Sequence, residues 1–444
     1  MMDFQVGFGR ICITPIEPVP LGGYGNTSRR ISQTKDSDLY CTCIAFTDPN
    51  GDSALVMSCD LLLTIKEWAD PGRKAAATAT GVPVERIIIS STHTHEAPDH
   101  GNTAFESILH HKQAMITWIA EAAKLAMDDR KPAKMFLGTT QLERVSYVRH
   151  YVLANGTYAG DNFGDFTSAP IVNSTTEADR TMQIVKFVRN GAKDVVLVNW
   201  QTHPHRSGGG TKLVVSADIV GGMRTAMERD TDCLFCYFSG ASGNINTRSR
   251  NHDLNLVGDH VVCGEYMAKQ AIAALDNLQQ ANTGPICGNH QIYSCKTDHT
   301  KDHLAEIGLQ LRKEWERTGD MAASIEAGKP YGIHSPYHAL AIFNKSKFPE
   351  TRDVEMAAVG FGDLAFVAAP YEMFDTNGVQ IKQASPYAST FVCTCANSYV
   401  GYVPSAYGYA HGCYEADCTP LAPGSGELLA MEYISMLCNT KQES

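Results

Sequence analysis

The chain has 444 residues, of which 43% are hydrophobic and 19% charged, a composition typical of a globular protein. Its formal net charge of -11 argues against nucleic acid or an anionic membrane as a partner. No apolar run reaches the roughly 18 residues of a membrane span, which argues against an integral membrane association. We expect a small molecule as the substrate, and the composition is compatible with a homo-oligomer.

Apolar patterns along the chain predict a succession of strands and helices. In chain order, the expected elements are strands at 4–13 and 41–59, a helix at about 65–80, a strand starting at 87, a helix at about 104–128, strands at 133–139, 145–153, 182–187 and 194–200, a helix opening at 216–218, a strand at 234–238, a helix at 256–278, a strand at 286–294, a helix at 302–318, strands at 355–359 and 364–369, a helix after 372, a strand at 390–396 and a helix from about 426. Residues 154–178 have the composition of a surface excursion, and the pattern of residues 319–350 is too weak for an assignment.

The fold class predicted is α/β, with a mixed β-sheet core flanked by helices. Because no repeat, low-complexity linker or clear boundary interrupts the chain, we expect one domain over residues 1–444.

Cysteine usage and the start of the chain bear on location. Of the 14 cysteines, only Cys233 and Cys236 form a Cys-x-x-Cys pair, and a zinc ribbon would need a second one. We therefore expect buried, reduced thiols that pack as small apolar side chains. The start, Met1-Met2-Asp3-Phe4, lacks the basic and apolar regions of a signal peptide, so we predict a cytoplasmic location.

The first chemically informative segment follows the apolar run Ile87–Ile89. This run leads into Ser90-Ser91-Thr92-His93-Thr94-His95. Residues i and i+2 of an extended chain share a face, and α/β sheets place ligands at the carboxyl ends of their strands. Neutral imidazole is the commonest metal ligand, so the pair predicts a metal-dependent hydrolase site. The alternative is two hydrogen-bonded core histidines.

A second strand, 194–200, also ends in histidines, in the segment Gln201-Thr202-His203-Pro204-His205. His203 is a second candidate ligand, with a structural core histidine as the alternative.

Asp60, which follows the strand region 41–59, could cap the next helix or support a ligand. Ser216 or Asp218 is the expected N-cap of the helix that opens there.

Several further segments, in the same order along the chain, carry a resemblance. They are Gly9-Arg10, Leu21-Gly22-Gly23-Tyr24, Ser58-Cys59-Asp60-Leu61, Thr92-His93-Thr94-His95, His203-Pro204, Ser216-Ala217-Asp218, Gly243-Asn244-Ile245-Asn246, Pro370-Tyr371-Glu372 and Tyr402 through Tyr414-Glu415. In these motifs the chain resembles the catalytic domain of the neutral/alkaline, non-lysosomal ceramidase family. The resemblance implies a ceramidase-like α/β domain without the C-terminal β-sandwich that larger members of the family carry.

The resemblance also implies a set of site residues. The family holds a zinc ion (Zn2+) with two His, one Glu and one Tyr, which correspond here to His93, His203, Glu372 and Tyr414. His95 then acts on the substrate, and Tyr402 and Arg149 stabilise the developing oxyanion. Other roles stay open for three types of residue: Glu372 could open a helix, both tyrosines could be packing aromatics, and Arg149 could be a surface or ion-paired residue.

One position departs from the family pattern. The loop that has the form Gly-Asp-Val-Ser-Pro-Asn in the family has Asn246 at the Ser position. Asn cannot serve as an alkoxide nucleophile, so we expect a metal-activated water as the nucleophile, with Asn246 donating a hydrogen bond. The substitution argues against ceramide itself as the substrate.

The predicted function is therefore a zinc-dependent hydrolase that cleaves an amide C–N bond, or an ester, of a small cytosolic substrate. Two alternatives stay open. One is a metal-binding protein that lost catalysis along with the Ser, and the other is a metal-dependent enzyme that acts on a polar metabolite such as a sugar derivative.

Overall fold

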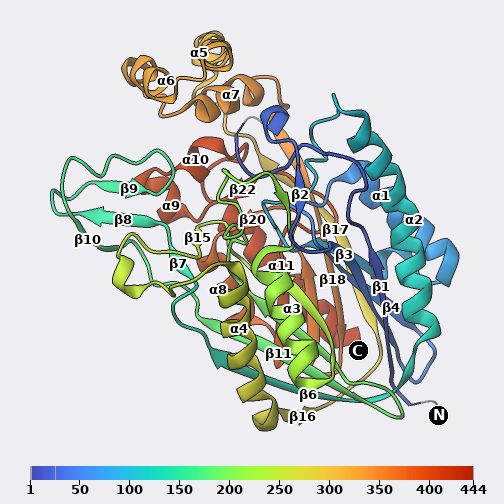
Figure 1. Cartoon of the computed structure of the whole chain (residues 1–444). Coiled ribbons are helices and arrows are strands. Elements are labelled where there is room, and N and C mark those ends of the chain that lie inside the picture. Colours follow the sequence, from blue (N-terminus) through green and yellow to red (C-terminus); the bar gives the residue numbers. More distant parts are fainter. Residues whose placement is uncertain (1–2, 26, 444) are drawn as a thin grey trace.

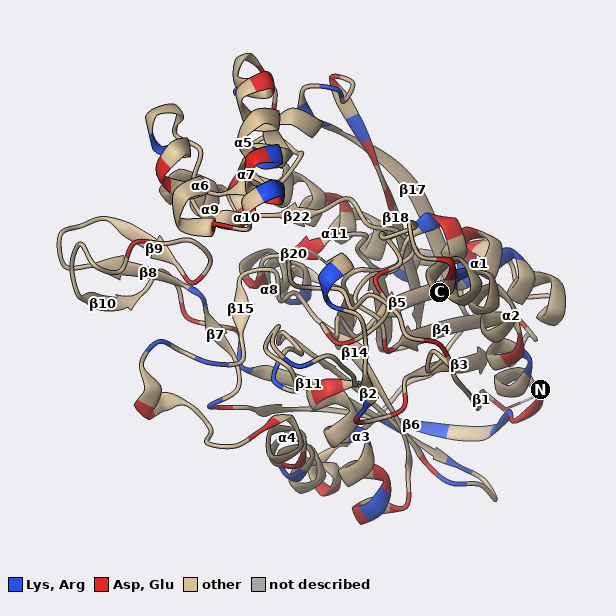
Figure 2. Ribbon diagram, turned by 45° about the horizontal axis from the view of Figure 1, so that its top comes forward, with Lys and Arg blue, Asp and Glu red and all other residues tan. Residues whose placement is uncertain are grey.

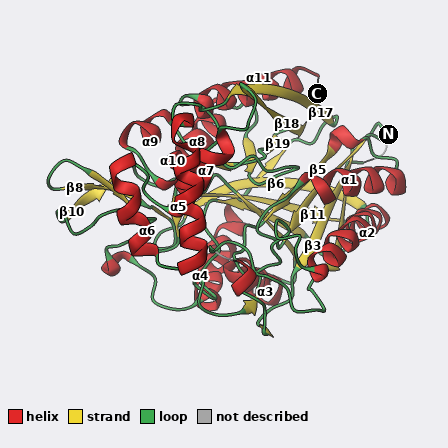
Figure 3. Ribbon diagram, turned by 90° about the horizontal axis from the view of Figure 1, so that it is seen from above, coloured by secondary structure: helices red, strands yellow, loops and turns green. Residues whose placement is uncertain are grey.

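The computed structural model of the protein describes residues 3–25 and 27–443. Met1 and Met2, which belong to the segment from which we predict a cytoplasmic location, lie outside the described residues. The described chain is built on β-sheets with helices on their outer faces (Figures 1 and 3). This architecture confirms the predicted α/β class with a mixed-sheet core flanked by helices. No helix in the described ranges is long and apolar enough to span a membrane.

The larger sheet has nine strands. Its order is β14 (Leu234–Ser239), β12 (Val195–Trp200), β11 (Thr181–Arg189), β6 (Lys131–Gln141), β1 (Gln5–Cys12), β3 (Tyr40–Thr47), β4 (Ser53–Cys59) and β5 (Ile87–Ser91), with β16 (Gln279–Ala281) beside β6. β12 and β14 are parallel, as are β4 and β5, and the other pairs are antiparallel. β11 and β12 form a hairpin whose turn contains Asn190 and Gly191.

A second sheet of four strands covers one face of the first. Its order is β17 (Cys287–Lys296), β18 (Thr351–Phe361), β19 (Leu364–Ala368) and β21 (Ser389–Cys393). A three-stranded sheet has the order β10 (Ile171–Ser174), β8 (His150–Leu153) and β9 (Tyr158–Gly160). The two-stranded sheets are β13 (Val214–Val215) with β2 (Thr34–Lys35), β15 (Ile245–Asn246) with β7 (Tyr147–Val148), and β20 (Glu372–Met373) with β22 (Tyr402–Val403).

The helices of the described chain fall into two sets, those that pack on the outer faces of the two sheets and those that lie apart from these faces. They are α1 (Lys66–Thr80), α2 (Glu106–Asp128), α3 (Asp218–Thr231), α4 (His260–Ala274), α5 (Ala305–Thr318), α6 (Met321–Gly328), α7 (Pro336–Lys345), α8 (Asp375–Ala384), α9 (Ala406–His411), α10 (Tyr414–Cys418) and α11 (Ser425–Glu443). Helices α1 to α4 lie against the larger sheet, and α8 and α11 against the smaller one. Helices α5, α6 and α7 form a group of their own beside α9 and α10 (Figure 1).

Strands such as β4, β12, β19 and β21 are buried on both faces, which explains their nearly continuous apolar sequences. In β12, for example, Leu197 faces the core between the two sheets, whereas Val196 and Val198 face the helices. The core between the sheets contains aromatic side chains from each sheet, among them Phe46 and Phe366, whose ring centroids are 5.8 Å apart. Burial from both sides holds the strand ends in fixed positions, and those ends carry the candidate site.

The two edges of the larger sheet are brought together by the segment that follows β21. The backbone N–H of Thr394 donates to Ser239 at the end of β14, and that of Asn397 donates to Ile89 in β5, at 3.1 and 2.7 Å. The Ser58 hydroxyl of β4 also donates to the carbonyl oxygen of Tyr237 in β14, at 2.6 Å. The carboxyl end of β5 therefore lies close to those of β12 and β14.

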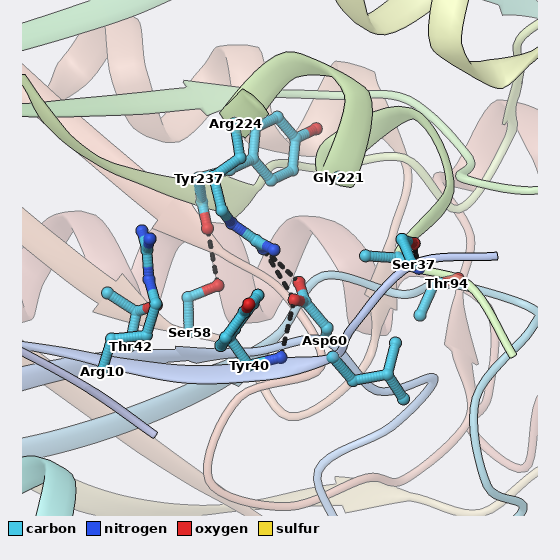
Figure 4. Close-up of polar contacts among 12 residues, drawn as sticks. Arg10, Ser37, Tyr40, Thr42, Ser58, Asp60, Thr94, Gly221, Arg224 and Tyr237 are labelled. Atoms are coloured by element: carbon cyan, nitrogen blue, oxygen red, sulfur yellow. Dashed lines mark hydrogen bonds and ion pairs between the residues drawn. The ribbon is translucent and has the colours of Figure 1, made fainter. Parts of the chain in front are cut away.

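Asp60 has a role that neither sequence alternative covers. Its two carboxylate oxygens each accept a hydrogen bond from Arg224 Nη2 at 2.7 Å, and Oδ2 also accepts one from the backbone N–H of Tyr40 (Figure 4). The Asp60 side chain is 1% exposed. Neither the helix cap nor the ligand support is therefore observed. The residue forms a buried ion pair that attaches α3 to the end of β4.

Replacing Asp60 by alanine is expected to lower the free energy of unfolding by about 3–5 kcal/mol, because it leaves the Arg224 charge buried without a partner. Urea denaturation of the purified variant measures this loss. Asp230→Ala is the control, since its ion pair with Arg229 is exposed. If both variants unfold at the same urea concentration, the buried pair does not have the stabilising role we assign to it.

A second ion cluster attaches α1 to the smaller sheet. Glu355 of β18 accepts hydrogen bonds from Arg73 and His290, at 2.6 and 3.1 Å, and its other oxygen lies 3.1 Å from Lys66 Nζ. Burial alone would raise the pKa of Glu355, but these three neighbours lower it below its usual 4.5. The stabilisation is therefore complete above pH 4.5 and is lost as the pH falls toward the lower pKa of the folded state.

The variant Glu355→Gln tests this pH dependence. We expect its Tm to lie a few degrees below that of the wild type at pH 7, with a gap that stays constant down to about pH 5.5 and narrows on further acidification. Thermal denaturation at a series of pH values measures the gap. A gap that widens as the pH falls would have the wrong sign for a carboxylate with a lowered pKa.

The structure differs from the expected elements in five places. The strand region 41–59 is a hairpin, because the Asp48 side chain accepts hydrogen bonds from the backbone of the turn that it opens. The surface excursion 154–178 contains β9 and β10, and residues 319–350 are mainly helical. The helix expected at 256–278 begins at His260, because the Asp259 side chain caps it. The expected Ser216 or Asp218 cap of α3 is absent, since Ala217 occupies the N-cap position.

All 14 cysteines lie in the described part of the chain, and none of them forms a disulfide. Most are buried, and burial raises the pKa of thiols such as Cys236, to about 12. The expectation of reduced, packed thiols is confirmed for these residues, whereas Cys12 is exposed.

Candidate active site

His93 and His203 lie side by side in the structure. Their Nε2 atoms are 3.2 Å apart, and their ring centroids are 4.7 Å apart. Glu372 Oε2 lies 3.3 Å from His93 Nε2 and 3.8 Å from His203 Nε2. Three donor atoms from residues far apart in sequence thus converge on one point.

The other polar atoms of these three residues are held by hydrogen bonds. His93 Nδ1 lies 2.9 Å from the Leu62 carbonyl oxygen, and His203 Nδ1 lies 3.1 Å from that of Ser242. Each ring therefore carries its proton on Nδ1 and directs the lone pair of Nε2 to the common point. Glu372 Oε1 accepts a hydrogen bond from Tyr399 at 2.7 Å.

The common point fits a metal ion. Glu372 Oε2 is buried and lacks a hydrogen-bond partner in the described structure. Two imidazole lone pairs and a carboxylate oxygen in such proximity repel each other unless a cation or a proton lies between them. The hydrogen bond from Tyr399 to Oε1 stabilises the ionised form of the Glu372 carboxylate. Two imidazole nitrogens and one carboxylate oxygen are a donor set that zinc accepts.

The local backbone explains how His93 reaches this point. β5 ends at Ser91, and His93 adopts a left-handed conformation with φ of 67°. The extended geometry that we expected to place His93 and His95 on one face is therefore absent. The two rings are nevertheless near each other, with centroids 5.1 Å apart. A turn rather than a strand presents them, and the backbone N–H of His95 donates to Pro204, which joins the two histidine segments.

Glu372 is positioned by the sheet that β20 forms with β22. Glu372 and Tyr402 are register partners in this parallel pair, and α8 begins only at Asp375. The alternative interpretation of Glu372 as the acidic residue of a helix N-terminus is therefore wrong. The pairing brings the Pro-Tyr-Glu segment and the segment of the two tyrosines to the same place.

A chamber of about 790 Å³ opens beside this cluster, and we call it the site chamber. It is lined by predicted site residues and by one histidine that we did not single out; these are His95, Arg149, His203, His205, Asn246, Tyr402 and Tyr414. The structure thus brings all of the predicted catalytic residues to one chamber, next to the three convergent donor atoms.

His95 has no hydrogen-bond partner at either ring nitrogen among the described residues, although it is buried. Burial lowers the pKa of His95 far below 6.5, and the neighbouring His93 and His205 lower it further. A neutral imidazole with both nitrogens uncommitted can accept a proton from one group and donate one to another.

Arg149 and Tyr402 line the chamber together. The guanidinium carbon of Arg149 is 5.9 Å from the centre of the Tyr402 ring. Arg149 is buried and pairs with Glu415 at 2.5 Å, so a surface role is excluded and an ion-paired one is observed. Glu415 also lies 2.8 Å from His150 Nε2. Glu415 was not among our candidates, although it directly follows Tyr414 in the sequence.

Tyr414 and Asn246 also line the site chamber. Tyr414 opens α10 and packs against Tyr402, with ring centroids 5.8 Å apart. Burial raises the pKa of its phenol well above 10, so its role as a fourth metal ligand stays a prediction. Asn246 Nδ2 donates to Asp161 at 2.8 Å, and its Oδ1 lies 3.2 Å from His205 Nε2.

Two other groups of side chains have the spacing of metal ligands in the described chain. One consists of His150, Cys413 and Glu415, and the other of His334, His338 and Asp417. In the first, the Glu415 carboxylate is already neutralised by Arg149. In the second, Lys301 Nζ lies 3.1 Å from His338 Nε2. A neighbouring cation disfavours a metal ion at either place, whereas no Lys or Arg forms a hydrogen bond or ion pair with His93, His203 or Glu372 in the described part of the chain.

The comparisons with known proteins agree with this architecture. No protein-family model matches the chain, and no curated protein sequence matches it significantly. Among solved structures, the neutral ceramidase from Pseudomonas aeruginosa is similar over 100% of this chain and 75% of its own, with a TM-score of 0.72 and 15% sequence identity. A ceramidase complexed with C2 is similar over 100% of this chain and 76% of its own, with a TM-score of 0.70 and 16% identity. The protein therefore has the neutral ceramidase fold that the sequence motifs predict.

Proposed function

We propose that the protein is a metal-dependent hydrolase that cleaves an amide C–N bond, or an ester, of a small molecule. The observation that carries the proposal is the convergence of His93 Nε2, His203 Nε2 and the unpartnered Glu372 Oε2 beside the site chamber. The structural neighbours are named ceramidases, which supports amide cleavage as the reaction class.

In this proposal His93, His203 and Glu372 hold a zinc ion, with Tyr414 as the fourth candidate ligand. When bound, zinc lowers the pKa of a coordinated water to about 7 and polarises the scissile carbonyl. Tyr399 fixes the Glu372 carboxylate so that Oε2 alone is directed to the ligand position. The two backbone carbonyl groups at Leu62 and Ser242 keep both imidazoles in the tautomer that ligation requires.

The remaining residues act on the substrate. His95 accepts the proton of the attacking water and returns it to the leaving nitrogen or oxygen. The Tyr402 hydroxyl and the Arg149 guanidinium donate hydrogen bonds to the oxygen that becomes negative in the transition state. Glu415 orients Arg149 for this purpose. In this arrangement no Ser nucleophile is needed, and Asn246 contributes by its contact with His205.

A turnover screen tests the proposal. Purified protein is incubated with a series of amides and matched esters, before and after removal of metal by a chelator, and again after addition of zinc. We expect turnover that disappears on chelation and returns with zinc. Turnover that survives complete metal removal would contradict the proposal, and bound zinc without turnover would favour the alternative of a metal-binding protein.

A further inference from the structure

The lining of the site chamber is unusual in two respects. Among its described lining residues there is no Leu, Ile, Val or Met and no Asp or Glu. Its large apolar lining groups are aromatic rings, among them Phe163 and Tyr337. Five basic side chains line it, and these are Arg30, Arg149, Arg206, Lys212 and Arg248. An extended alkyl chain would find no aliphatic partner in this chamber.

Two of the basic side chains are neutralised by carboxylates. Arg30 pairs with Glu96 at 2.9 Å, and Arg149 pairs with Glu415. The other three, Arg206, Lys212 and Arg248, have no carboxylate within ion-pair distance in the part of the chain that the structure describes. The chamber therefore has an excess of positive charge, although the protein as a whole has a net charge of -11 and carries both signs of charge throughout its ribbon (Figure 2).

Arg206 gives the strongest sign of a missing partner. The residue is only 9% exposed. Its Nη2 donates to the carbonyl oxygens of Leu256 and Gly258 at 2.8 and 2.9 Å, whereas Nε and Nη1 are buried and have no hydrogen-bond partner among the described residues. A buried charge with uncompensated donors is costly, so its presence points to an anionic ligand.

The surroundings of Arg206 support the same interpretation. Burial lowers the pKa of Arg206, Cys263 and Asp218 partly offset this effect, and the neighbouring Arg248 adds to it. The guanidinium nevertheless keeps its proton at neutral pH. Asp218 is the nearby acid, but its oxygens accept hydrogen bonds from the backbone of Ser207 and Ile219. Two arginines that repel each other in one chamber are an arrangement that a shared anion stabilises.

We propose that the substrate carries a negatively charged oxyanion, a carboxylate, sulfate or phosphate, which Arg206 binds together with Arg248 and Lys212. The inference rests on the proposed function for the cleaved bond, but the anion site depends only on these three residues. A polar amide or ester with an acidic group fits the chamber better than a neutral lipid amide does. The local positive charge in an acidic protein would also favour the capture of anions.

The first test compares matched substrates. N-acetyl amino acids, their neutral carboxamides and a long-chain neutral amide are offered to the zinc-loaded protein, and kcat/KM is measured for each. We expect the acids to be preferred over their carboxamides, and we expect Arg206→Gln and Arg248→Gln each to reduce this preference by about tenfold or more. Equal rates for acids and carboxamides, or a preference for the long-chain amide, would overturn the inference while leaving the proposed hydrolase intact.

The second test does not depend on turnover. Binding of inorganic sulfate to the zinc-loaded protein is measured by calorimetry for the wild type, Arg206→Gln, Arg248→Gln and Lys212→Gln. Arg229→Gln is the control, because this exposed arginine of α3 pairs with Asp230 and Glu265. We expect binding that is weakened about tenfold or more in the three chamber variants and retained in the control.

The substrate comparison and the sulfate-binding test together distinguish failure of the anion site from failure of the proposed hydrolase. Lys212 and Arg248 are exposed, so their variants test the site even if Arg206→Gln does not fold. Absence of sulfate binding in the wild type, or binding that the chamber variants leave unchanged, overturns the anion site. Sulfate binding that the variants weaken, without turnover of any amide or ester, would support the anion site and contradict only the hydrolase.

Discussion

Replacing His93 by alanine is expected to abolish metal binding and activity together. The variant loses one of three convergent donor atoms and leaves Glu372 Oε2 without the imidazole at 3.3 Å. Loss of a residue that merely supports a ligand already weakens metal affinity about 10- to 100-fold, so the loss of a ligand should exceed about 100-fold. Metal analysis of the purified variant, together with the turnover screen, measures both effects.

The control for this variant is His334→Ala. His334 belongs to the separate group with His338 and Asp417, and its side chain is largely exposed. We expect this control to keep the metal content of the wild type. Circular dichroism checks that His93→Ala is folded. Zinc content that is unchanged in a folded His93→Ala variant would rule out the proposed metal centre.

Replacing His95 by glutamine is expected to leave the metal in place and to lower kcat by about 10² to 10⁴, the usual contribution of a general acid–base residue. The reason is that His95 has two uncommitted ring nitrogens in the site chamber. Metal analysis measures the zinc that the variant retains, and steady-state kinetics measures its kcat. Together they separate a catalytic effect from loss of the metal.

The matched control is His205→Gln, which removes a second imidazole from the same chamber. His205 is engaged by Asn246, and its ring centroid is 5.7 Å from that of His95. We expect a clearly smaller loss of kcat than for His95→Gln. If the order of the two effects is reversed, the proton-transfer role belongs to His205 and our assignment of His95 is wrong.

The sequence was sufficient to predict the fold class and the clustering of the site. Apolar runs such as Ile87–Ile89 ended in polar residues at strand ends, and the structure places those ends together. His93 and His203 lie close together because residues 394–397 connect the two edges of the larger sheet. The single-domain organisation and the cytoplasmic location stay predictions.

Other features depend on contacts that a local pattern does not contain. The helices within 319–350 have short, half-exposed segments without a continuous apolar stripe. Tyr399 and Glu415 acquire their roles from partners 27 and 266 residues away in the chain. The unpaired state of Arg206 likewise becomes visible only when the carboxylates around it can be located. Tertiary packing, rather than residue type, decides these cases.

The measurement that tests the metal centre most directly is anomalous X-ray scattering at the zinc absorption edge from crystals of the zinc-loaded protein. The proposed site predicts one strong peak within bonding distance of His93 Nε2, His203 Nε2 and Glu372 Oε2. A peak at His150, Cys413 and Glu415 or at His334, His338 and Asp417, with none at the predicted position, would contradict the central claim.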